Sequence, residues 1–252
     1  MNLPVAAETC PDLAPGDITI LGKRVVLWMD PAATEAADGP LVIYWHGTGS
    51  NPNFEAPVGL GPAMDDVVAA GGIVAAFYAE PCMGCRTTGN NVWYYEDFAR
   101  ADELLACAIE QVGIDTRRIH TAGMSAGGLQ ASAMVYARSN YLASATSYSG
   151  GIIAIFTDTM PQDPANKLPV MIVHGGAMDQ VVIKFQDTSN AFKADLTMKG
   201  HFSFICDHGM AHTIPAGINV ATWQFFQDHP YGTDPSPYAG GLPTSFPDYC
   251  GL

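Results

Sequence analysis

Basic residues are scarce in this chain. Only 11 of its 252 residues are Lys or Arg, against 25 Asp or Glu, and the formal net charge is -14. The few cations are scattered, so no run of them is able to follow a phosphate backbone or an anionic membrane surface. We therefore expect neither nucleic acid nor a membrane as a partner.

The chain also lacks internal repeats and long apolar runs. No apolar run approaches the roughly 20 residues that cross a bilayer. Residues 1–8 show neither a basic segment nor the long apolar stretch of a signal peptide. Two alternatives remain: a cytoplasmic protein, or a chain whose signal peptide has been removed.

The six cysteines, at positions 10, 82, 85, 107, 206 and 250, favour the second alternative. An even count spread along a globular chain fits up to three disulfides in an oxidising compartment, which predicts a secreted or periplasmic protein. We expect Cys206 to pair with Cys250, because the Pro-rich tail needs an anchor. Cys82 and Cys85 have the spacing of half a zinc site, but no second Cys-x-x-Cys follows, so we expect no metal.

Nearly half of the residues, 48%, are apolar. A chain of this length suits one large domain and can bury about three quarters of its unfolded surface. We expect a single domain over residues 1–252, with an irregular Pro- and Gly-rich tail at about 231–252, and a monomer.

Strands and helices alternate along the chain. Short apolar runs predict a pair of strands at 18–29, bending near 21–23, and single strands at 41–45, 73–78, 118–122, 142–148, 169–173 and 201–205. Helical spacing predicts helices at 63–70, 96–112, from just after Ser125 to about 138, 183–195 and 219–227. This alternation is typical of an α/β fold, whose mostly parallel sheet is covered by helices on both faces. Ligands bind such sheets at the carboxyl ends of the strands.

The sharpest motif is Gly123-x-Ser125-x-Gly127, which stands between a predicted strand and a predicted helix. A nucleophile at such a junction needs a tight turn, and glycines two residues to either side remove Cβ atoms that would clash there. The N–H groups that open the following helix point towards a developing oxyanion. We predict Ser125 as a nucleophile; the alternative is a Gly-rich helix cap.

A serine nucleophile needs a base, and in this fold the chain order is Ser, acid, His. Asp179 follows a predicted strand and is the expected acid, whereas Asp187 and Asp195 fall on the next helix and are worse placed. Among the downstream histidines, His201, His208 and His212, we prefer His212 because it lies in the loop after the last strand, with His208 second. Asp179 would hold its Nδ1–H and leave Nε2 for Ser125.

Two amides are expected to form an oxyanion hole. One is Ala126, directly after the nucleophile, and the other is Thr48, in the loop that follows the strand ending at Trp45. The alternative for His46-Gly47 is a simple turn, and His46 is interpreted as structural. Trp93 and Tyr94 follow a Gly-Asn-Asn turn; they line a substrate cleft near Thr48 or, as such clusters more often do, pack in the core. Met124 is the remaining candidate for substrate contact.

These residues match a known family. Its anchors are Pro40 to Gly47, Asp115-x-x-Arg118-Ile119, Gly123-Met124-Ser125-Ala126-Gly127-Gly128, His174-Gly175 with Asp179, and His212 before Pro215. From about residue 18 to 226 the chain resembles the poly(3-hydroxybutyrate) depolymerase and feruloyl esterase group of α/β-hydrolases. The resemblance implies the triad Ser125, Asp179 and His212, an oxyanion hole at Thr48 and Ala126, a secreted setting, and no metal or organic cofactor.

One departure from the family concerns the histidine. Many members carry Gly-His-x-Trp-Pro there, whereas this chain has Ala211-His212-Thr213-Ile214-Pro215, without the Trp. The change bears on polymer specificity more than on catalysis.

The expected function is that of a secreted serine esterase. Only a short segment, 150–168, separates two predicted strands where many lipases place a lid, which indicates an open site suited to bulky or polymeric esters. Polyhydroxyalkanoates or other polyesters, and feruloyl or acetyl esters of plant polysaccharide, are the candidate substrates. The alternatives are a serine peptidase or acyl transferase on the same fold, or an inactive surface-binding protein.

Overall fold

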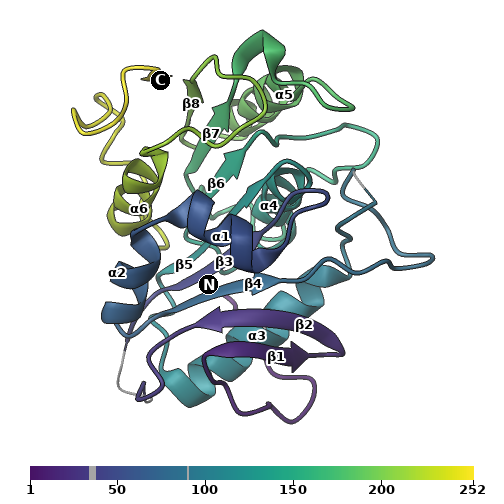
Figure 1. The fold of residues 1–252 in the computed structure, drawn as a ribbon. Helices are drawn as coiled ribbons and strands as arrows, with labels where there is room; N and C mark the ends of the chain where they lie inside the picture. The colour runs from purple at the N-terminus through teal and green to yellow at the C-terminus, as the bar shows by residue number, and fades with distance from the viewer. Residues whose placement is uncertain (34–37, 90) are drawn as a thin grey trace.

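The central sheet organises the molecule (Figure 1). The computed structural model describes residues 1–33, 38–89 and 91–252. Within these ranges nine strands pair in the order β1-β2-β4-β3-β5-β6-β7-β8-β9. The strands are β1 (Gly16–Ile20), β2 (Lys23–Trp28), β3 (Leu41–Trp45), β4 (Ile73–Phe77), β5 (Ile119–Met124), β6 (Ser144–Tyr148), β7 (Val170–His174), β8 (Ser203–Asp207) and β9 (Cys250–Gly251). Strands β3 to β8 pair in parallel, and β1, β2 and β9 pair with their neighbours antiparallel, so the mostly parallel sheet is confirmed.

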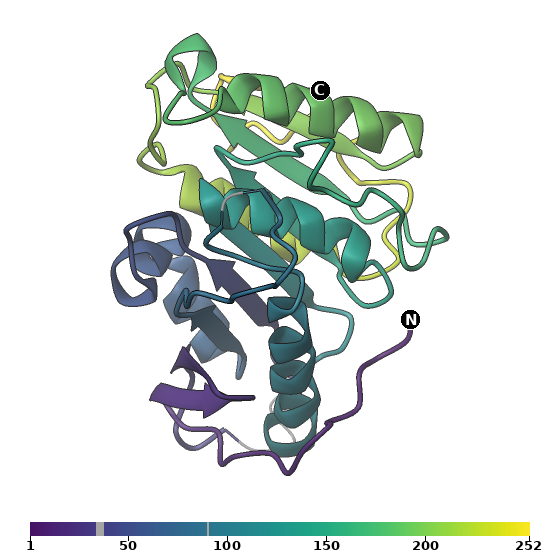
Figure 2. The ribbon, with the colours of Figure 1, turned by 90° about the vertical axis from the view of Figure 1, so that its right-hand side faces the viewer.

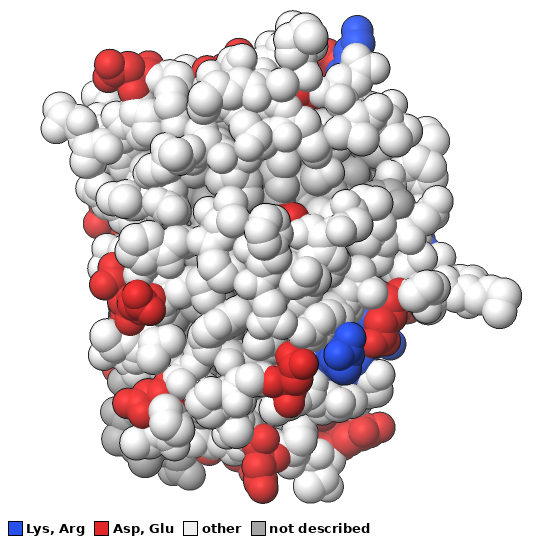
Figure 3. Space-filling view, in the orientation of Figure 1, with Lys and Arg blue, Asp and Glu red and all other residues white. Residues whose placement is uncertain are grey.

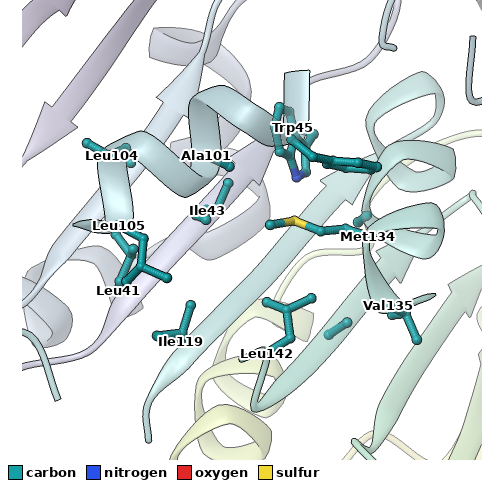
Figure 4. Packing of buried hydrophobic residues seen from close by; sticks show 14 of the residues in the cluster. Leu41, Ile43, Trp45, Ala101, Leu104, Leu105, Ile119, Met134, Val135 and Leu142 are labelled. Carbon is teal, nitrogen blue, oxygen red and sulfur yellow. The ribbon is translucent and has the colours of Figure 1, made fainter. Parts of the chain in front are cut away.

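Helices cover both faces of the sheet (Figures 1 and 2). On β3, Leu41, Ile43 and Trp45 belong to a core that includes residues of α3 and α4 (Figure 4). Residues of α5 belong to the same core. Val42 and Tyr44, which alternate with the three β3 residues, belong to a second core with α1, α2 and α6. Successive strand side chains point to opposite faces, so one apolar run serves both cores. The helices are α1 (Pro52–Leu60), α2 (Ala63–Ala69), α3 (Asp97–Val112), α4 (Ala126–Ala137), α5 (Phe185–Met198) and α6 (Ile218–Asp228), with a 3₁₀ turn η1 (Gly176–Met178).

One helix was not predicted. Helix α1 carries Pro57 in its interior, and prolines interrupt helical patterns in a sequence. Its start is nevertheless well formed, since Asn51 Oδ1 accepts the N–H of Phe54 at 3.1 Å and Pro52 occupies the first helical position. The other predicted helices and strands are present, with ends displaced by a few residues.

All six cysteines are paired. The predicted Cys206–Cys250 disulfide is confirmed, and it joins β8 to the tail, where β9 adds a short strand to a segment expected to be irregular throughout. Cys10 pairs with Cys107 of α3, and Cys82 pairs with Cys85 in the loop after β4. Among the described residues no helix is both long and apolar enough to cross a bilayer.

The connection from β6 to β7 has no regular secondary structure. Residues 149–169, all of them described, contain neither a helix nor a strand. This segment therefore places no helix over the carboxyl ends of the strands.

Candidate active site

Ser125 occupies a strained turn between β5 and α4. Its backbone has φ 58° and ψ −117°, a conformation that a residue with a side chain adopts only when its surroundings enforce it. Ser125 N–H donates to Tyr148 O at 2.9 Å, which ties the turn to β6. A Cβ on Gly127 would lie 1.8 Å from Trp45 O, so only glycine there lets α4 approach β3. The turn leaves the Ser125 side chain partly exposed at the edge of the sheet.

His212 lies within hydrogen-bonding distance of Ser125. Its Nε2 is 3.0 Å from Ser125 Oγ, and its Nδ1 is 2.7 Å from Asp179 Oδ1. Because the carboxylate oxygen accepts, Nδ1 carries the proton, and Nε2 is left to accept from the hydroxyl. Ser125, Asp179 and His212, the three residues predicted from the sequence, lie on three separate loops, and the structure brings their side chains together.

The loops that carry Asp179 and His212 pack against each other. A Cβ on Gly175 would lie 1.8 Å from Ala211 O, and Ala211 N–H donates to Gly175 O at 3.2 Å. Ala211 itself has φ 60°. This close approach, possible only without a side chain at 175, carries the imidazole of His212 over to the carboxylate.

Asp179 is a buried carboxylate with three hydrogen bonds. Its Oδ2 accepts Gly175 N–H at 2.9 Å and Ser149 Oγ–H at 2.8 Å, while Oδ1 faces His212. Burial by itself raises the pKa of Asp179, but the bonds from His212, Gly175 and Ser149 outweigh it and lower that pKa below its ordinary value. The carboxylate is therefore ionised at neutral pH.

Phe185, at the start of α5, stacks on the imidazole. The two ring centroids are 4.7 Å apart and the rings are inclined by 23°. This contact fixes the plane of His212 in addition to its two hydrogen bonds. This contact could not be predicted from the sequence, because an aromatic residue at a helix start is also typical of core packing.

The other candidate acids and bases lie elsewhere. His201 Nδ1 faces Leu168 O at 3.0 Å, and His208 Nδ1 accepts the N–H of Met210 at 3.2 Å. Asp195 accepts from Tyr136 Oη, and Asp187 is exposed on α5. None of these four bonds to Ser125, which leaves His212 and Asp179 as the pair with the required geometry.

The loop after β3 passes beside the nucleophile. A Cβ on Gly47 would lie 3.2 Å from Ser125 Cβ, and the exposed Thr48 follows directly. Gly47 O accepts from His46 Nδ1 at 2.8 Å and from Ser50 N–H at 3.2 Å. His46 Nε2 in turn accepts Ala79 N–H, and burial lowers the pKa of His46. His46 is thus a neutral imidazole that shapes the loop.

The three residues expected to contact substrate are buried. Trp93 is 0% exposed, and its Nε1 donates to His46 O at 2.8 Å. Tyr94 donates from its hydroxyl to Asn91 O, and Met124 packs in the core shared with α1 and α6. Of the two interpretations of Trp93 and Tyr94, their burial supports core packing, and the indole of Trp93 braces the loop through its bond to His46 O.

Four exposed apolar side chains, here called the apolar rim, lie in the two loops that carry Asp179 and His212: Met178, Val181, Val182 and Met210. Val182 is 89% exposed at the tip of a small projection, which a β-bridge between Gln180 and Lys184 closes at its base. In the described part of the chain, no group of three or more His, Cys, Asp or Glu side chains is placed to hold a metal ion.

Charge is sparse on the face of the molecule that Figure 3 shows. Its acidic side chains lie mainly towards the edges, and basic side chains are few. The centre of this face therefore offers mostly uncharged surface.

Comparison with solved structures identifies the fold. The chain is similar to native pOPH (TM-score 0.72, 16% identity, 96% of this chain and 95% of that chain). It is also similar to the Bacillus cereus carboxylesterase (TM-score 0.60, 16% identity, 82% and 94%) and to a ferulic acid esterase (TM-score 0.55, 17% identity, 80% and 89%). No family model and no curated protein sequence matches the chain. The fold is that of the α/β-hydrolases, and esterases are among its structural neighbours.

Proposed function

We propose that the protein is a serine carboxylic ester hydrolase. The observation that carries the proposal is the continuous chain of contacts from Ser125 Oγ to His212 Nε2 and from His212 Nδ1 to Asp179 Oδ1, at 3.0 and 2.7 Å. A hydroxyl, an imidazole with a free Nε2 lone pair and an ionised carboxylate in this order are the parts of an acyl-transfer site.

The reaction proceeds by two acyl transfers. His212 Nε2 takes the proton of Ser125 Oγ, which attacks the ester carbonyl and forms a tetrahedral oxyanion. The amides of Thr48 and Ala126 donate to that oxygen. His212 then protonates the leaving alcohol, and the acyl group stays on Ser125. Water, deprotonated by His212, attacks the acyl-enzyme, and His212 returns the proton to Ser125 Oγ as the acid leaves.

Three features support a bulky or polymeric ester as the substrate. The segment 149–169 has no helix that would enclose a small ligand. The apolar rim, in the loops that carry Asp179 and His212, is suited to a water-insoluble acyl or polymer surface. The scarcity of basic side chains favours an uncharged substrate. We therefore propose polyesters such as polyhydroxyalkanoates, or feruloyl and acetyl esters of plant polysaccharide, as the substrate class, and a secreted protein, which the three disulfides support.

Two measurements test the proposal. The wild-type protein should hydrolyse p-nitrophenyl acetate and react covalently with a fluorophosphonate probe at Ser125, whereas Ser125→Ala should do neither and keep its melting temperature within about 2 °C. If Ser125→Ala still hydrolysed the ester, Ser125 would not be the nucleophile and the proposal would be wrong. A panel of short esters, feruloyl esters, polyester films and peptides separates an esterase from a peptidase, and turnover confined to short free esters would count against the polymeric class.

A further inference from the structure

Glu55 is a buried carboxyl group that the mechanism above leaves without a role. It lies in the first turn of α1, directly after the loop that carries Thr48, and is only 9% exposed. Burial raises the pKa of Glu55. Burying a carboxyl group costs free energy of folding unless its hydrogen bonds compensate for the lost contact with water. The hydrogen bonds of Glu55 therefore indicate its role.

The shorter of two measured hydrogen bonds to Glu55 comes from the backbone of the loop, and the hydroxyl of Ser50, in the same loop, also lowers the pKa of Glu55. Glu55 Oε1 accepts Gly47 N–H at 2.7 Å, with Tyr44 Oη at 3.4 Å as a second, longer donor. A Cβ on Gly47 would lie 3.3 Å from Glu55 Oε2 and 3.2 Å from Ser125 Cβ. The carboxyl group and the nucleophile therefore lie against the same glycine.

The peptide unit between His46 and Gly47 is held at both ends. Its carbonyl oxygen, His46 O, accepts Trp93 Nε1–H at 2.8 Å, and its N–H donates to Glu55. A trans peptide is planar, so these two opposed bonds fix the orientation of the whole unit. The loop enters the candidate site at an angle that Glu55 and Trp93 set together.

The next peptide unit presents the oxyanion donor. Gly47 O accepts from His46 Nδ1 and from Ser50 N–H, at 2.8 and 3.2 Å. In a trans unit the N–H points away from the carbonyl oxygen, so Thr48 N–H points away from both of these donors. Among the described residues Thr48 N–H has no protein acceptor, which leaves it available to a ligand.

We propose that Glu55 is a positioning residue for ester hydrolysis at Ser125: by accepting Gly47 N–H it holds the loop so that Thr48 N–H faces the oxyanion. The inference rests on the function proposed above. Glu55 acts through Gly47 and does not touch the substrate. A preset donor is what lowers the barrier, because its orientation need not change when charge develops on the carbonyl oxygen.

The test compares variants that keep or remove the acceptor. Glu55→Gln retains an Oε1 oxygen for Gly47 N–H, whereas Glu55→Ala and Glu55→Leu do not, and leucine also preserves most of the volume if alanine folds poorly. For p-nitrophenyl acetate we expect kcat to fall about 10- to 100-fold in the alanine and leucine variants, less than the roughly 100- to 1,000-fold cost of deleting an oxyanion donor. KM should change less than about threefold, and Glu55→Gln should keep kcat within about threefold of wild type.

Glu103 supplies a matched control. It is also buried, and its carboxylate also accepts backbone amides, from Ala7 and Glu8 at 2.7 and 3.0 Å, but it lies on α3 and holds the N-terminal segment. Glu103→Ala should lower the melting temperature to a similar extent as Glu55→Ala and leave kcat unchanged. Phenylboronic acid, which forms a tetrahedral adduct on a reactive serine, should inhibit Glu55→Ala and Glu55→Leu about 10- to 100-fold more weakly than wild type, in proportion to the loss of kcat.

The possible failures can be told apart. Wild-type kcat in Glu55→Leu, or an equal loss of kcat in Glu55→Gln and Glu55→Leu, would overturn the positioning role while Ser125→Ala remains inactive. An equal loss of kcat in Glu103→Ala would overturn it as well, since the effect would then be one of general destabilisation. Turnover by Ser125→Ala would instead overturn the proposed function itself.

Discussion

Ser149 Oγ donates a hydrogen bond to Asp179 Oδ2 at 2.8 Å, on the side of the carboxylate that His212 does not use. Ser149 directly follows β6 and has φ 42°, so the neighbouring strand provides this bond from a strained position. The two carboxylate oxygens of Asp179 therefore have different partners. Oδ1 faces the imidazole of His212, and Oδ2 accepts hydrogen bonds from Ser149 and from the backbone of Gly175.

Replacing Ser149 by alanine tests how much its hydrogen bond to Asp179 Oδ2 contributes. Asp179 Oδ2 would keep only the Gly175 N–H, and we expect a loss of about 1–2 kcal/mol in the free energy of unfolding with a few-fold fall in kcat. Urea unfolding and ester turnover check this. Ser245→Ala, which removes an exposed hydroxyl bonded to Gln224, is the control and should change neither. An unaltered midpoint and kcat in Ser149→Ala would mean that the bond contributes nothing.

Asp179→Asn should keep the fold and lose most of the activity. The amide can present an N–H to His212 Nδ1 and so favour the wrong tautomer, which costs on the order of 10⁴-fold in kcat in a serine triad. Steady-state kinetics on p-nitrophenyl acetate measure the loss. If the variant kept more than about a tenth of the wild-type kcat, Asp179 would not be the residue that orients His212.

The same variant gives a pH dependence of stability. The pKa of Asp179 is lowered in the folded protein from an ordinary value of 3.8, so its ionised form stabilises the fold above that value. This contribution is lost as the pH falls below about 4, through the folded pKa. The difference in unfolding free energy between wild type and Asp179→Asn should therefore change below about pH 4 in the direction that disfavours wild type. Urea titrations above and below this pH check it, and a difference independent of pH would contradict the lowered pKa.

Gly127→Ala should destabilise the protein severely. The new Cβ would lie 1.8 Å from Trp45 O, and backbone atoms can relieve such a contact only by moving α4 away from β3. We expect a loss of more than about 3 kcal/mol, measured by thermal or urea unfolding. Gly240→Ala is the matched control, because a Cβ there meets nothing within 4 Å, and it should stay within about 0.5 kcal/mol of wild type. Equal stability of the two variants would refute the close packing.

The apolar rim should contribute to the binding of insoluble substrates and not to the turnover of soluble ones. Val182→Ser is expected to leave turnover of p-nitrophenyl acetate unchanged and to reduce adsorption to a polyester film about three- to tenfold, because it removes exposed apolar area from the tip of the projection. Val5→Ser is the control, since Val5 is 87% exposed in the N-terminal segment. Equal adsorption of the two variants would show that the rim does not bind the polymer.

The sequence predicts the triad better than it predicts the residues around it. Ser125, Asp179 and His212 follow from a local turn motif and from chain order, both of which the fold imposes. Trp93 could not be assigned in the same way, because nothing in the local pattern tells which side of the loop an aromatic ring will face; its Nε1 bond to His46 O puts it underneath.

Glu55 was missed for a related reason. Helix α1 is hidden in the sequence by Pro57, and without the helix there is no basis for turning the side chain at 55 back towards Gly47. Predicted strands were found with modest shifts, because their apolar runs have to be buried on both faces whatever the details of the loops.

The absence of a helix between β6 and β7 has a kinetic consequence. A hydrolase covered by a helical flap must first open it, and contact with an oil or micelle surface then accelerates turnover abruptly. Residues 149–169 hold no such flap. Velocity should consequently rise smoothly as a sparingly soluble ester passes its solubility limit, without a lag or a jump.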